Sequence, residues 1–278
     1  MKVLVTGANG MLGQDLCPIL EDEGFDVIET DIHNLDITNL EQVKSILAES
    51  KPEYVIHCAA YTNVDKAEED KENAFKINYE GTKNIATVCN ELDITLVYIS
   101  TDYVFDGEKQ GKYLPNDKPN PQNVYGESKL KGEEEVKKCK KYYITRTSWL
   151  YGHHGKNFVE TMISLANKEE LKVVNDQKGC PTWTVELCNG IITLIDEEMP
   201  YGIYQVCGSG ETTWYDFAKE IFELSNLTVN LKPCSTTEFP RPAKRPKNSV
   251  MDNNKICRDW KIALKEYLDL RCEWKELF

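Results

Sequence analysis

Two residues of this 278-residue chain have the types and spacing needed to move a proton at a carbonyl group. Tyr125 and Lys129 stand four residues apart in a segment that is expected to be helical, so one helical turn places both side chains on the same face. A free tyrosine has a pKa near ~10 and exchanges protons poorly at neutral pH. A nearby ammonium group stabilises the phenolate and lowers that pKa toward the working range.

The spacing alone is common, and its weight comes from a pair of hydroxyl residues elsewhere in the chain. Ser100 and Thr101 directly follow an expected strand, Thr95–Ile99, and Thr101 stands 24 residues before Tyr125. The end of a strand opens into the crevice of a doubly wound sheet. The sequence therefore predicts that the hydroxyl pair and the tyrosine–lysine pair meet in one site.

A glycine-rich turn follows the first expected strand and opens a helix. Its residues are Thr6-Gly7-Ala8-Asn9-Gly10-Met11-Leu12-Gly13. Gly7 permits a tight turn, Gly10 lets the backbone approach a pyrophosphate, and Gly13 lets the helix pack close to the strand. The helix N-terminus adds free N–H groups and a partial positive charge. This pattern predicts a dinucleotide site, with a plain strand–helix turn as the alternative. Pro18 is expected to kink or loosen the helix.

Asp31 ends the second expected strand, 18 residues beyond Gly13. A carboxylate in this position accepts hydrogen bonds from the adenosine ribose. It would repel the 2′-phosphate of NADPH, so Asp31 favours NADH, unless it is a solvated turn residue. Asp36 and Ile37 are expected to flank the adenine.

Short apolar strands alternate with longer helical stretches through the first half of the chain. The expected strands are Val3–Val5, Asp26–Glu29, Tyr54–Cys58, Thr95–Ile99 and Tyr142–Ile144. Apolar strands separated by helices predict an α/β fold with a doubly wound, Rossmann-type parallel sheet that is covered on both faces.

The pattern changes after Trp149, where prolines and irregular segments become frequent. Helices are expected at Asn157–Asn167, Thr184–Glu197 and Thr212–Leu224, and a strand at Gly202–Val206 could rejoin the sheet. We therefore expect a smaller, discontinuous α/β lobe. Residues 1–149 and 184–208 would form the dinucleotide-binding domain, and residues 150–183 and 209–278 the substrate lobe.

Composition narrows the class of protein. The formal net charge of −13 disfavours nucleic-acid binding, which needs a basic face. None of the ten cysteines stands in a CxxC spacing, so no metal site is expected. No apolar stretch approaches the roughly 18 residues of a membrane span. We expect a cytoplasmic protein that does not bind membranes.

Five segments together resemble the extended short-chain dehydrogenase/reductases. They are TGANGMLG at 6–13, VIHCAAYT at 55–62, YISTDYVFDG at 98–107, YGESK at 125–129 and RTSWLYG at 146–152. Two further segments, NDQKGCPT at 175–182 and RPKNS at 245–249, make the chain similar to the dTDP-4-dehydrorhamnose reductases in particular. The resemblance covers nearly the whole chain.

The resemblance implies an NADH- or NADPH-dependent oxidoreductase that acts on a dTDP-sugar. It would reduce the C4 ketone of dTDP-6-deoxy-L-lyxo-4-hexulose to dTDP-L-rhamnose. Thr101 would hydrogen-bond the C4 carbonyl, with Ser100 as the second candidate. Tyr125 would deliver the proton, while Lys129 would hold the nicotinamide ribose and tune Tyr125.

Further roles come from the same resemblance. Asn78 matches the relay asparagine of the superfamily, with helix packing as an equal alternative, whereas His57 is expected to be a core histidine. The pyrophosphate and ribose side would be lined by Ala59, Ala60 and Tyr61. The sugar would be surrounded by Asp102, Tyr103 and Trp149, and the nucleotide and diphosphate would contact Asn157, Gln177 and Arg245.

Two other kinds of protein remain open. One is a related sugar-nucleotide reductase or an epimerase/dehydratase, although the dehydratases carry an acidic pair after the threonine and here Tyr103 follows Asp102. The other is a noncatalytic regulatory subunit similar to that of methionine adenosyltransferase, which would not need the Thr–Tyr–Lys set. A homodimer is possible, but the sequence does not fix the oligomeric state.

Overall fold

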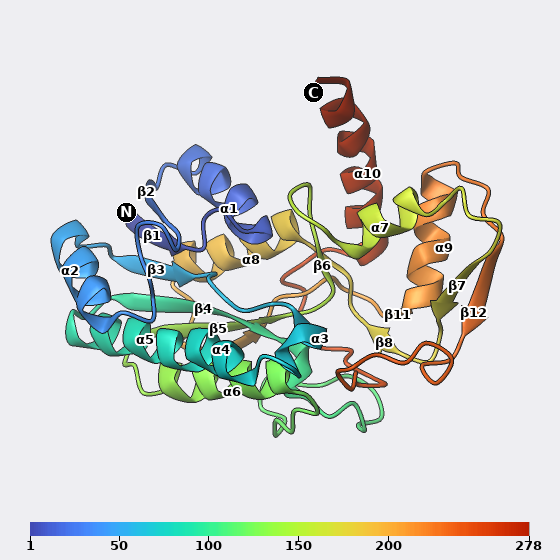
Figure 1. Ribbon diagram of the computed structural model, residues 1–278. Helices are drawn as coiled ribbons and strands as arrows, with labels where there is room; N and C mark the ends of the chain where they lie inside the picture. Colours follow the sequence, from blue (N-terminus) through green and yellow to red (C-terminus); the bar gives the residue numbers. More distant parts are fainter. Residues whose placement is uncertain (278) are drawn as a thin grey trace.

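A six-stranded parallel sheet forms the centre of the protein (Figure 1). It is seen in a computed structural model that describes residues 1–277. In spatial order the strands are β10 (Gly202–Gln205), β5 (Tyr142–Thr147), β4 (Thr95–Thr101), β3 (Tyr54–His57), β1 (Lys2–Thr6) and β2 (Asp26–Thr30). The chain order reverses between β1 and β3, which is the place where ligands bind at the carboxyl ends of such sheets.

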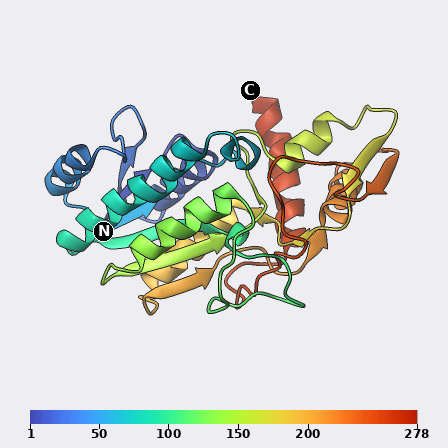
Figure 2. The ribbon, with the colours of Figure 1, turned by 60° about the horizontal axis from the view of Figure 1, so that its bottom comes forward.

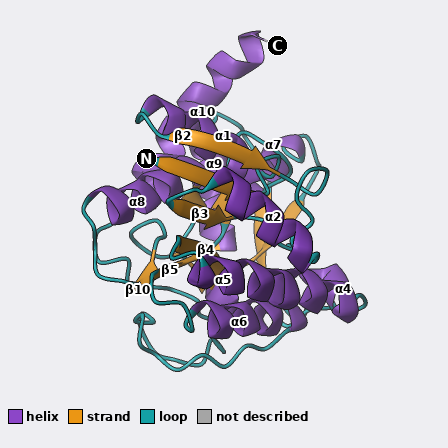
Figure 3. Cartoon of the chain, turned by 90° about the vertical axis from the view of Figure 1, so that its left-hand side faces the viewer, coloured by secondary structure: helices purple, strands orange, loops and turns teal. Residues whose placement is uncertain are grey.

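Helices cover both faces of this sheet (Figure 3). One face carries α1 (Met11–Asp22) and α8 (Thr184–Asp196), and the other carries α2 (Leu40–Ser50), α5 (Thr82–Glu91) and α6 (Val124–Val136). Side chains alternate along a strand, so Val3 and Val5 pack with the first layer while Leu4 packs with the second. Two separate apolar cores therefore hold the carboxyl ends of the strands in place.

Short helical segments lead the chain into and out of these layers. They are α3 (Val64–Ala67), α4 (Lys71–Phe75), a π-helical segment (Lys76–Gly81) that runs into α5, and a 3₁₀ turn (Asp102–Val104) after β4. The π-helical segment carries Asn78 toward α6, where its side chain is fully buried. Such segments often occur at functional sites.

A smaller lobe lies beside the carboxyl ends of the strands (Figures 1 and 2). Three short strand pairs contribute to it: β6 (Leu150–Tyr151) with β9 (Thr182–Trp183), β7 (Leu171–Val174) with β12 (Leu231–Cys234), and β8 (Lys178–Gly179) with β11 (Thr212–Thr213). Its helices are α7 (Phe158–Ser164), α9 (Trp214–Leu224) and α10 (Trp260–Leu277). Aromatic side chains such as Tyr151, Phe217 and Trp260 form its core.

The predicted α/β fold with a doubly wound parallel sheet is confirmed, and β10 rejoins the sheet beside β5 as expected. Helix α1 continues through Pro18 as one element from Met11 to Asp22, and the expected kink at Pro18 stays a prediction. Helix α7 ends at Ser164, three residues before the predicted Asn167. The functional division into a dinucleotide domain and a substrate lobe stays a prediction.

Other expectations concern thiols, metals and membranes. All cysteines whose side chains are described are free, and the side chain of Cys272 lies outside that set. Among the side chains that the structure describes, no group of three or more His, Cys, Asp or Glu residues could hold a metal ion. None of the helices described is long and apolar enough to cross a bilayer.

Candidate active site

A cavity of about 690 Å³ lies at the carboxyl ends of the strands. Its lining brings together four regions: the glycine-rich turn, the segment after β2, the ends of β3 and β4 with the start of α6, and the residues around Trp149 and Trp214. Cavities of this size hold ligands as large as cofactors. The region is therefore the candidate active site.

The glycine-rich turn has the geometry that a dinucleotide needs. Gly7 adopts a φ of +69°, and an added Cβ there would stand 2.7 Å from the Ala59 nitrogen. A Cβ on Gly13 would stand 2.5 Å from the Gly7 oxygen. Gly10 caps α1 without a side chain, and no acidic residue follows in the first turn. The first-turn N–H groups of α1 thus remain available for a phosphate, and Gly10, Met11, Leu12 and Gly13 all line the cavity.

Asp31 joins this turn to the segment after β2. Its Oδ2 accepts a hydrogen bond of 3.0 Å from the Asn9 backbone, and its Oδ1 accepts one of 2.7 Å from the Ile32 backbone. Each carboxylate oxygen has a second acceptor position, so a ribose hydroxyl can still bind. Asp31, Asp36 and Ile37 line the cavity, and their contact with the adenosine stays a prediction.

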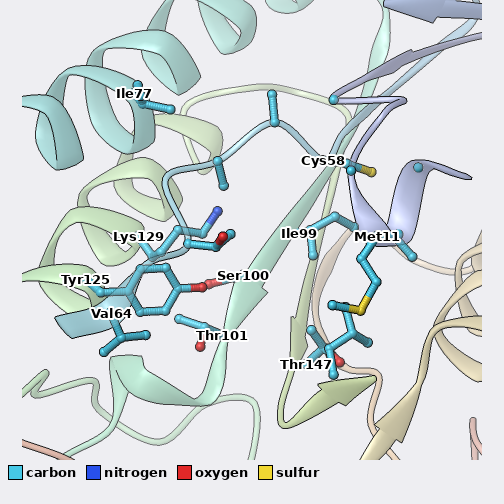
Figure 4. A pocket seen from close by; sticks show the side chains of 18 of the residues that line it. Met11, Cys58, Val64, Ile77, Ile99, Ser100, Thr101, Tyr125, Lys129 and Thr147 are labelled. Atoms are coloured by element: carbon cyan, nitrogen blue, oxygen red, sulfur yellow. The ribbon is translucent and has the colours of Figure 1, made fainter. Parts of the chain in front are cut away.

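The opposite wall carries the three residues predicted to be catalytic. Thr101 ends β4, while Tyr125 and Lys129 lie on α6, whose N-cap Asn123 accepts a hydrogen bond of 2.8 Å from the Gly126 backbone. Figure 4 shows Tyr125, Lys129 and Thr101 on one side of the cavity, facing Met11 on the other. The sequence prediction that these three residues share one pocket is therefore in agreement with the geometry.

Burial changes the proton affinity of both residues on α6. It raises the pKa of Tyr125 to about 12, although a hydrogen bond with Thr101 acts in the opposite direction. It lowers the pKa of Lys129 to about 7, against the attraction of Glu133. Without a ligand, Lys129 loses its proton at a lower pH than Tyr125 does. The lysine therefore does not lower the pKa of Tyr125 in this state, in contrast to the tuning expected from the sequence.

Thr101 and Asp102 both line the cavity beside Tyr125 and Lys129. The Thr101 hydroxyl donates to Asp102 Oδ1 at 3.1 Å and accepts from the Tyr103 backbone at 3.2 Å. Burial raises the pKa of Asp102 to about 7, while hydrogen bonds from Ser249 and Thr101 oppose the rise. A carboxyl group that titrates near neutral pH thus lies next to the candidate proton donor.

The neighbouring Ser100 is engaged elsewhere, which separates the two candidate hydroxyl groups. Its Oγ donates a hydrogen bond of 2.6 Å to Glu133 Oε1 in the interior of the protein. Thr101 is therefore the better candidate for contact with a substrate carbonyl group.

Asn78 makes all its side-chain hydrogen bonds within the protein. Its Oδ1 accepts from the Tyr61 backbone at 2.8 Å, and its Nδ2 donates to the Tyr61 carbonyl and to Ser128 Oγ at 3.0 and 2.9 Å. These bonds link the π-helical segment to α6 and favour the packing role. Ala59 and Ala60 line the cavity, whereas Tyr61 directs its hydroxyl to Asp70 at 3.2 Å.

His57 behaves as the predicted core histidine. Its ring lies between the hydroxyl groups of Thr6 and Thr82, at 2.7 and 3.1 Å. Burial and the nearby Lys129 lower its pKa to about 3, so the ring stays neutral.

The predicted substrate residues separate into two groups. Asp102, Tyr103 and Trp149 line the cavity. Asn157, Gln177 and Arg245 do not line the cavity. Each of them is bound to another group of the protein. Asn157 caps α7, Gln177 donates to Thr236 at 2.9 Å, and Arg245 pairs with Asp65 at 2.9 and 3.0 Å. Their contact with the nucleotide stays a prediction.

Sequence reasoning missed several residues of the lining. The most informative are Lys156, which supplies a second ammonium group besides Lys129, and Trp214, the first residue of α9. Neither residue belongs to a recognisable local motif. The fold brings both to the cavity from the smaller lobe. The apolar run of α9 was the only signal near Trp214.

Known proteins are similar to this chain over almost its whole length. The family described as RmlD substrate binding domain matches residues 1–271. A dTDP-4-dehydrorhamnose reductase of Aggregatibacter actinomycetemcomitans is 40% identical, over 95% of this chain and 97% of that protein.

Two solved structures are similar over almost their full length. A dTDP-4-dehydrorhamnose reductase from Clostridium acetobutylicum is 50% identical, with a TM-score of 0.94 over 97% of this chain and 99% of that chain. A dTDP-4-dehydrorhamnose reductase from Bacillus anthracis, solved in complex with NADP, is 43% identical, with a TM-score of 0.93 over the same shares of the two chains.

Proposed function

The chain belongs to the RmlD substrate binding domain family, and from this premise we propose that it is a dTDP-4-dehydrorhamnose reductase. It reduces the C4 ketone of dTDP-6-deoxy-L-lyxo-4-hexulose to dTDP-L-rhamnose with NADH or NADPH. One observation carries the proposal: Thr101, Tyr125 and Lys129 line the same cavity as the glycine-rich turn. A proton donor and a hydride source can therefore meet at one carbonyl group.

The residues of the glycine-rich turn would hold the cofactor. Gly10 and the first turn of α1 contact its pyrophosphate, and Asp31 contacts its adenosine ribose. Lys129 binds the nicotinamide ribose from the opposite wall. When bound, the nicotinamide supplies a hydride to the substrate carbon.

The protein supplies the proton and holds the carbonyl group. Thr101 donates a hydrogen bond to the C4 oxygen, so its hydroxyl turns away from Asp102. Tyr125 donates its phenolic proton to the same oxygen. A pKa of about 12 makes the phenol a weak acid, but the alkoxide that forms on carbonyl reduction is a stronger base, so transfer is downhill.

The rest of the proposal concerns the substrate and the setting. Asp102, Tyr103 and Trp149 surround the sugar, and Asn157, Gln177 and Arg245 lie toward the nucleotide. The division into a dinucleotide domain (1–149 and 184–208) and a substrate lobe (150–183 and 209–278) belongs to the proposal. A cytoplasmic location and a homodimer belong to it as well.

The related reductases and dehydratases are the main alternatives. A dehydratase needs an acidic pair after the threonine, but Tyr103 occupies the second position and packs edge-on against Tyr125 at 5.9 Å. A noncatalytic subunit would not require a half-buried tyrosine and a buried lysine in a cavity of this kind. These features favour the reductase.

The test is consumption of NADH or NADPH by the purified protein with dTDP-4-keto-6-deoxy sugars. We expect turnover with the L-lyxo substrate and a product identical to dTDP-L-rhamnose by chromatography and NMR. A product with the other configuration at C4 would indicate a related reductase. Turnover of none of these sugars would contradict the proposal.

A further inference from the structure

Trp149 has a backbone conformation that is unusual for a large side chain. Its φ is +48°, in the left-handed region, and it directly follows the segment that leaves β5. A residue with a bulky Cβ substituent adopts this region only where the surrounding structure holds it there. Trp149 lines the cavity, so the strain lies at the candidate substrate site.

Trp214 is the principal contact that holds this indole. The two rings are stacked with centroids 3.5 Å apart and an interplanar angle of 7°. Phe158 packs against Trp214 at 4.6 Å and extends the aromatic group into the core of the smaller lobe. Trp214 also lines the cavity, and no motif in the sequence had singled it out.

The backbone at Gly179 also approaches the Trp149 indole closely and leaves no room for a side chain there. A Cβ added to Gly179 would stand 2.3 to 2.6 Å from three atoms of the Trp149 indole. Gly179 pairs with Thr212 in the two-stranded sheet formed by β8 and β11. Trp214 begins α9 directly after β11, so one small sheet sets the positions of both groups that contact the indole of Trp149.

We propose that Trp214 is a positioning residue for sugar-nucleotide binding. It holds Trp149 in the left-handed conformation, and together the two indoles form a rigid apolar wall at the sugar end of the cavity. This inference rests on the proposed function for the identity of the ligand. Trp149 and Trp214 pack against the core of the smaller lobe, whereas the glycine-rich turn packs with the central sheet, so the role of Trp214 concerns the sugar nucleotide and not the dinucleotide.

The test compares Trp214→Ala with Trp214→Phe and with Phe222→Ala as the matched control. Phe222 is buried in the same helix but does not line the cavity. We expect Trp214→Ala to raise the KM for the dTDP-sugar about fivefold to tenfold, the fold-change of one lost aromatic pair. The KM for NADPH should stay within about twofold, and Trp214→Phe should restore most of the affinity for the sugar nucleotide.

A second measurement does not depend on turnover. Near-ultraviolet circular dichroism reports the packing of tryptophan side chains, so Trp214→Phe and Trp149→Phe should each change the signal of the two stacked indoles. Binding of dTDP-L-rhamnose, which carries the sugar that dTDP alone lacks, is measured by calorimetry in parallel for the wild type and Trp214→Ala. The wild type could lack reductase activity while Trp214→Ala still binds dTDP-L-rhamnose more weakly than the wild type. That result would contradict the proposed function alone and leave the positioning role intact.

Other results would overturn the positioning role itself. One is an equal rise in the KM values for the dTDP-sugar and for NADPH. Another is an effect of Phe222→Ala as large as that of Trp214→Ala. A third is that Trp214→Ala leaves both the binding of dTDP-L-rhamnose and the KM for the dTDP-sugar unchanged.

Discussion

Arg146 and Glu133 form a bidentate ion pair in the interior of the protein. Arg146 Nε lies 2.9 Å from Glu133 Oε1, Nη2 lies 2.7 Å from Oε2, and the two side chains are 1% and 0% exposed. The pair joins β5 to α6, and Ser100 at the end of β4 donates to the same carboxylate. Glu133 is one helical turn beyond Lys129, so this pair fixes the helix that carries Tyr125 and Lys129.

Glu133→Gln should therefore destabilise the protein by about 3–5 kcal/mol, because it leaves the Arg146 guanidinium buried without a counter-charge. Burial favours a raised pKa for Glu133, but Arg146, with Ser100 and Lys137, outweighs it and holds that pKa below its ordinary value. The Glu133 carboxylate therefore contributes to the free energy of unfolding above its ordinary pKa. This contribution is lost as pH falls through the lower pKa of the folded protein. Urea unfolding at pH 7 measures it.

The control for this experiment is Glu134→Gln, because Glu134 is exposed on the same helix. We expect the control to change the free energy of unfolding by less than about 0.5 kcal/mol. A loss below about 1 kcal/mol in Glu133→Gln would show that the buried pair does not hold α6 in place.

The second prediction concerns Tyr125→Phe, which removes one hydroxyl and keeps the ring. Turnover should fall by roughly 10²–10⁴-fold, the usual scale for a general acid, while the affinity for NADPH stays nearly the same. The ring still packs edge-on against Tyr103, so the fold should be kept. Steady-state kinetics and NADPH titration check both statements. A loss of less than about tenfold would remove Tyr125 as the proton donor.

Local features of the site could be predicted from the sequence. The glycine-rich turn and the pair Tyr125 and Lys129 each depend on spacing within a few residues, and the strand that ends at Thr101 is set by its own apolar residues. The segment that contains Trp214 gave no such signal, because its contact with Trp149 depends on how the smaller lobe packs. No local pattern in the sequence predicts how the smaller lobe packs.

Glu133 illustrates the same limit inside one helix. It is the first of three consecutive glutamates, and only this one is fully buried. Its spacing of four from Lys129 and eight from Tyr125 places all three on one helical face, which was a usable signal. Its partner Arg146 lies on β5, outside this helix. The sequence therefore could not show that the buried charge of Glu133 would be neutralised.

Lys129 gives the third prediction, on the pH dependence of the reaction. Its pKa of about 7 in the free enzyme means that its ammonium group disappears as pH rises through neutrality. We expect kcat/KM for reduction to fall over that range in the wild type. Lys129→Ala should have a lower kcat/KM without this fall and a higher KM for the cofactor. A profile and a KM like those of the wild type would show that Lys129 does not contact the cofactor.

Asp102 titrates in the same range, so its effect is separated by stability measurements. Its folded pKa of about 7 lies above the ordinary value, so its contribution to stability is present at low pH and lost as pH rises through about 7. Asp102→Asn removes that loss. Relative to the wild type, the variant should gain roughly 2–3 kcal/mol between pH 5 and pH 8 in unfolding experiments without ligand. A difference that does not change with pH would show that Asp102 is ionised at both values.

The last prediction concerns the choice of cofactor and rests on Asp31, which lines the cavity and accepts a hydrogen bond of 3.0 Å from the Asn9 backbone. A carboxylate in this position accepts the 2′-hydroxyl of NADH but repels the 2′-phosphate of NADPH. At an effective dielectric constant near 20 and a separation of several ångströms, the repulsion is about 1–2 kcal/mol, or roughly tenfold in kcat/KM. Asp31→Asn keeps an acceptor for the Asn9 backbone and removes the charge, so it should improve kcat/KM with NADPH relative to NADH.

The control is Asp36→Asn, which also removes a charge from the lining but whose carboxylate is held by Thr38 at 2.7 and 2.9 Å. If Asp31→Asn leaves the ratio of the two cofactors unchanged, or if Asp36→Asn changes it equally, Asp31 does not face the ribose and the preference for NADH has another origin.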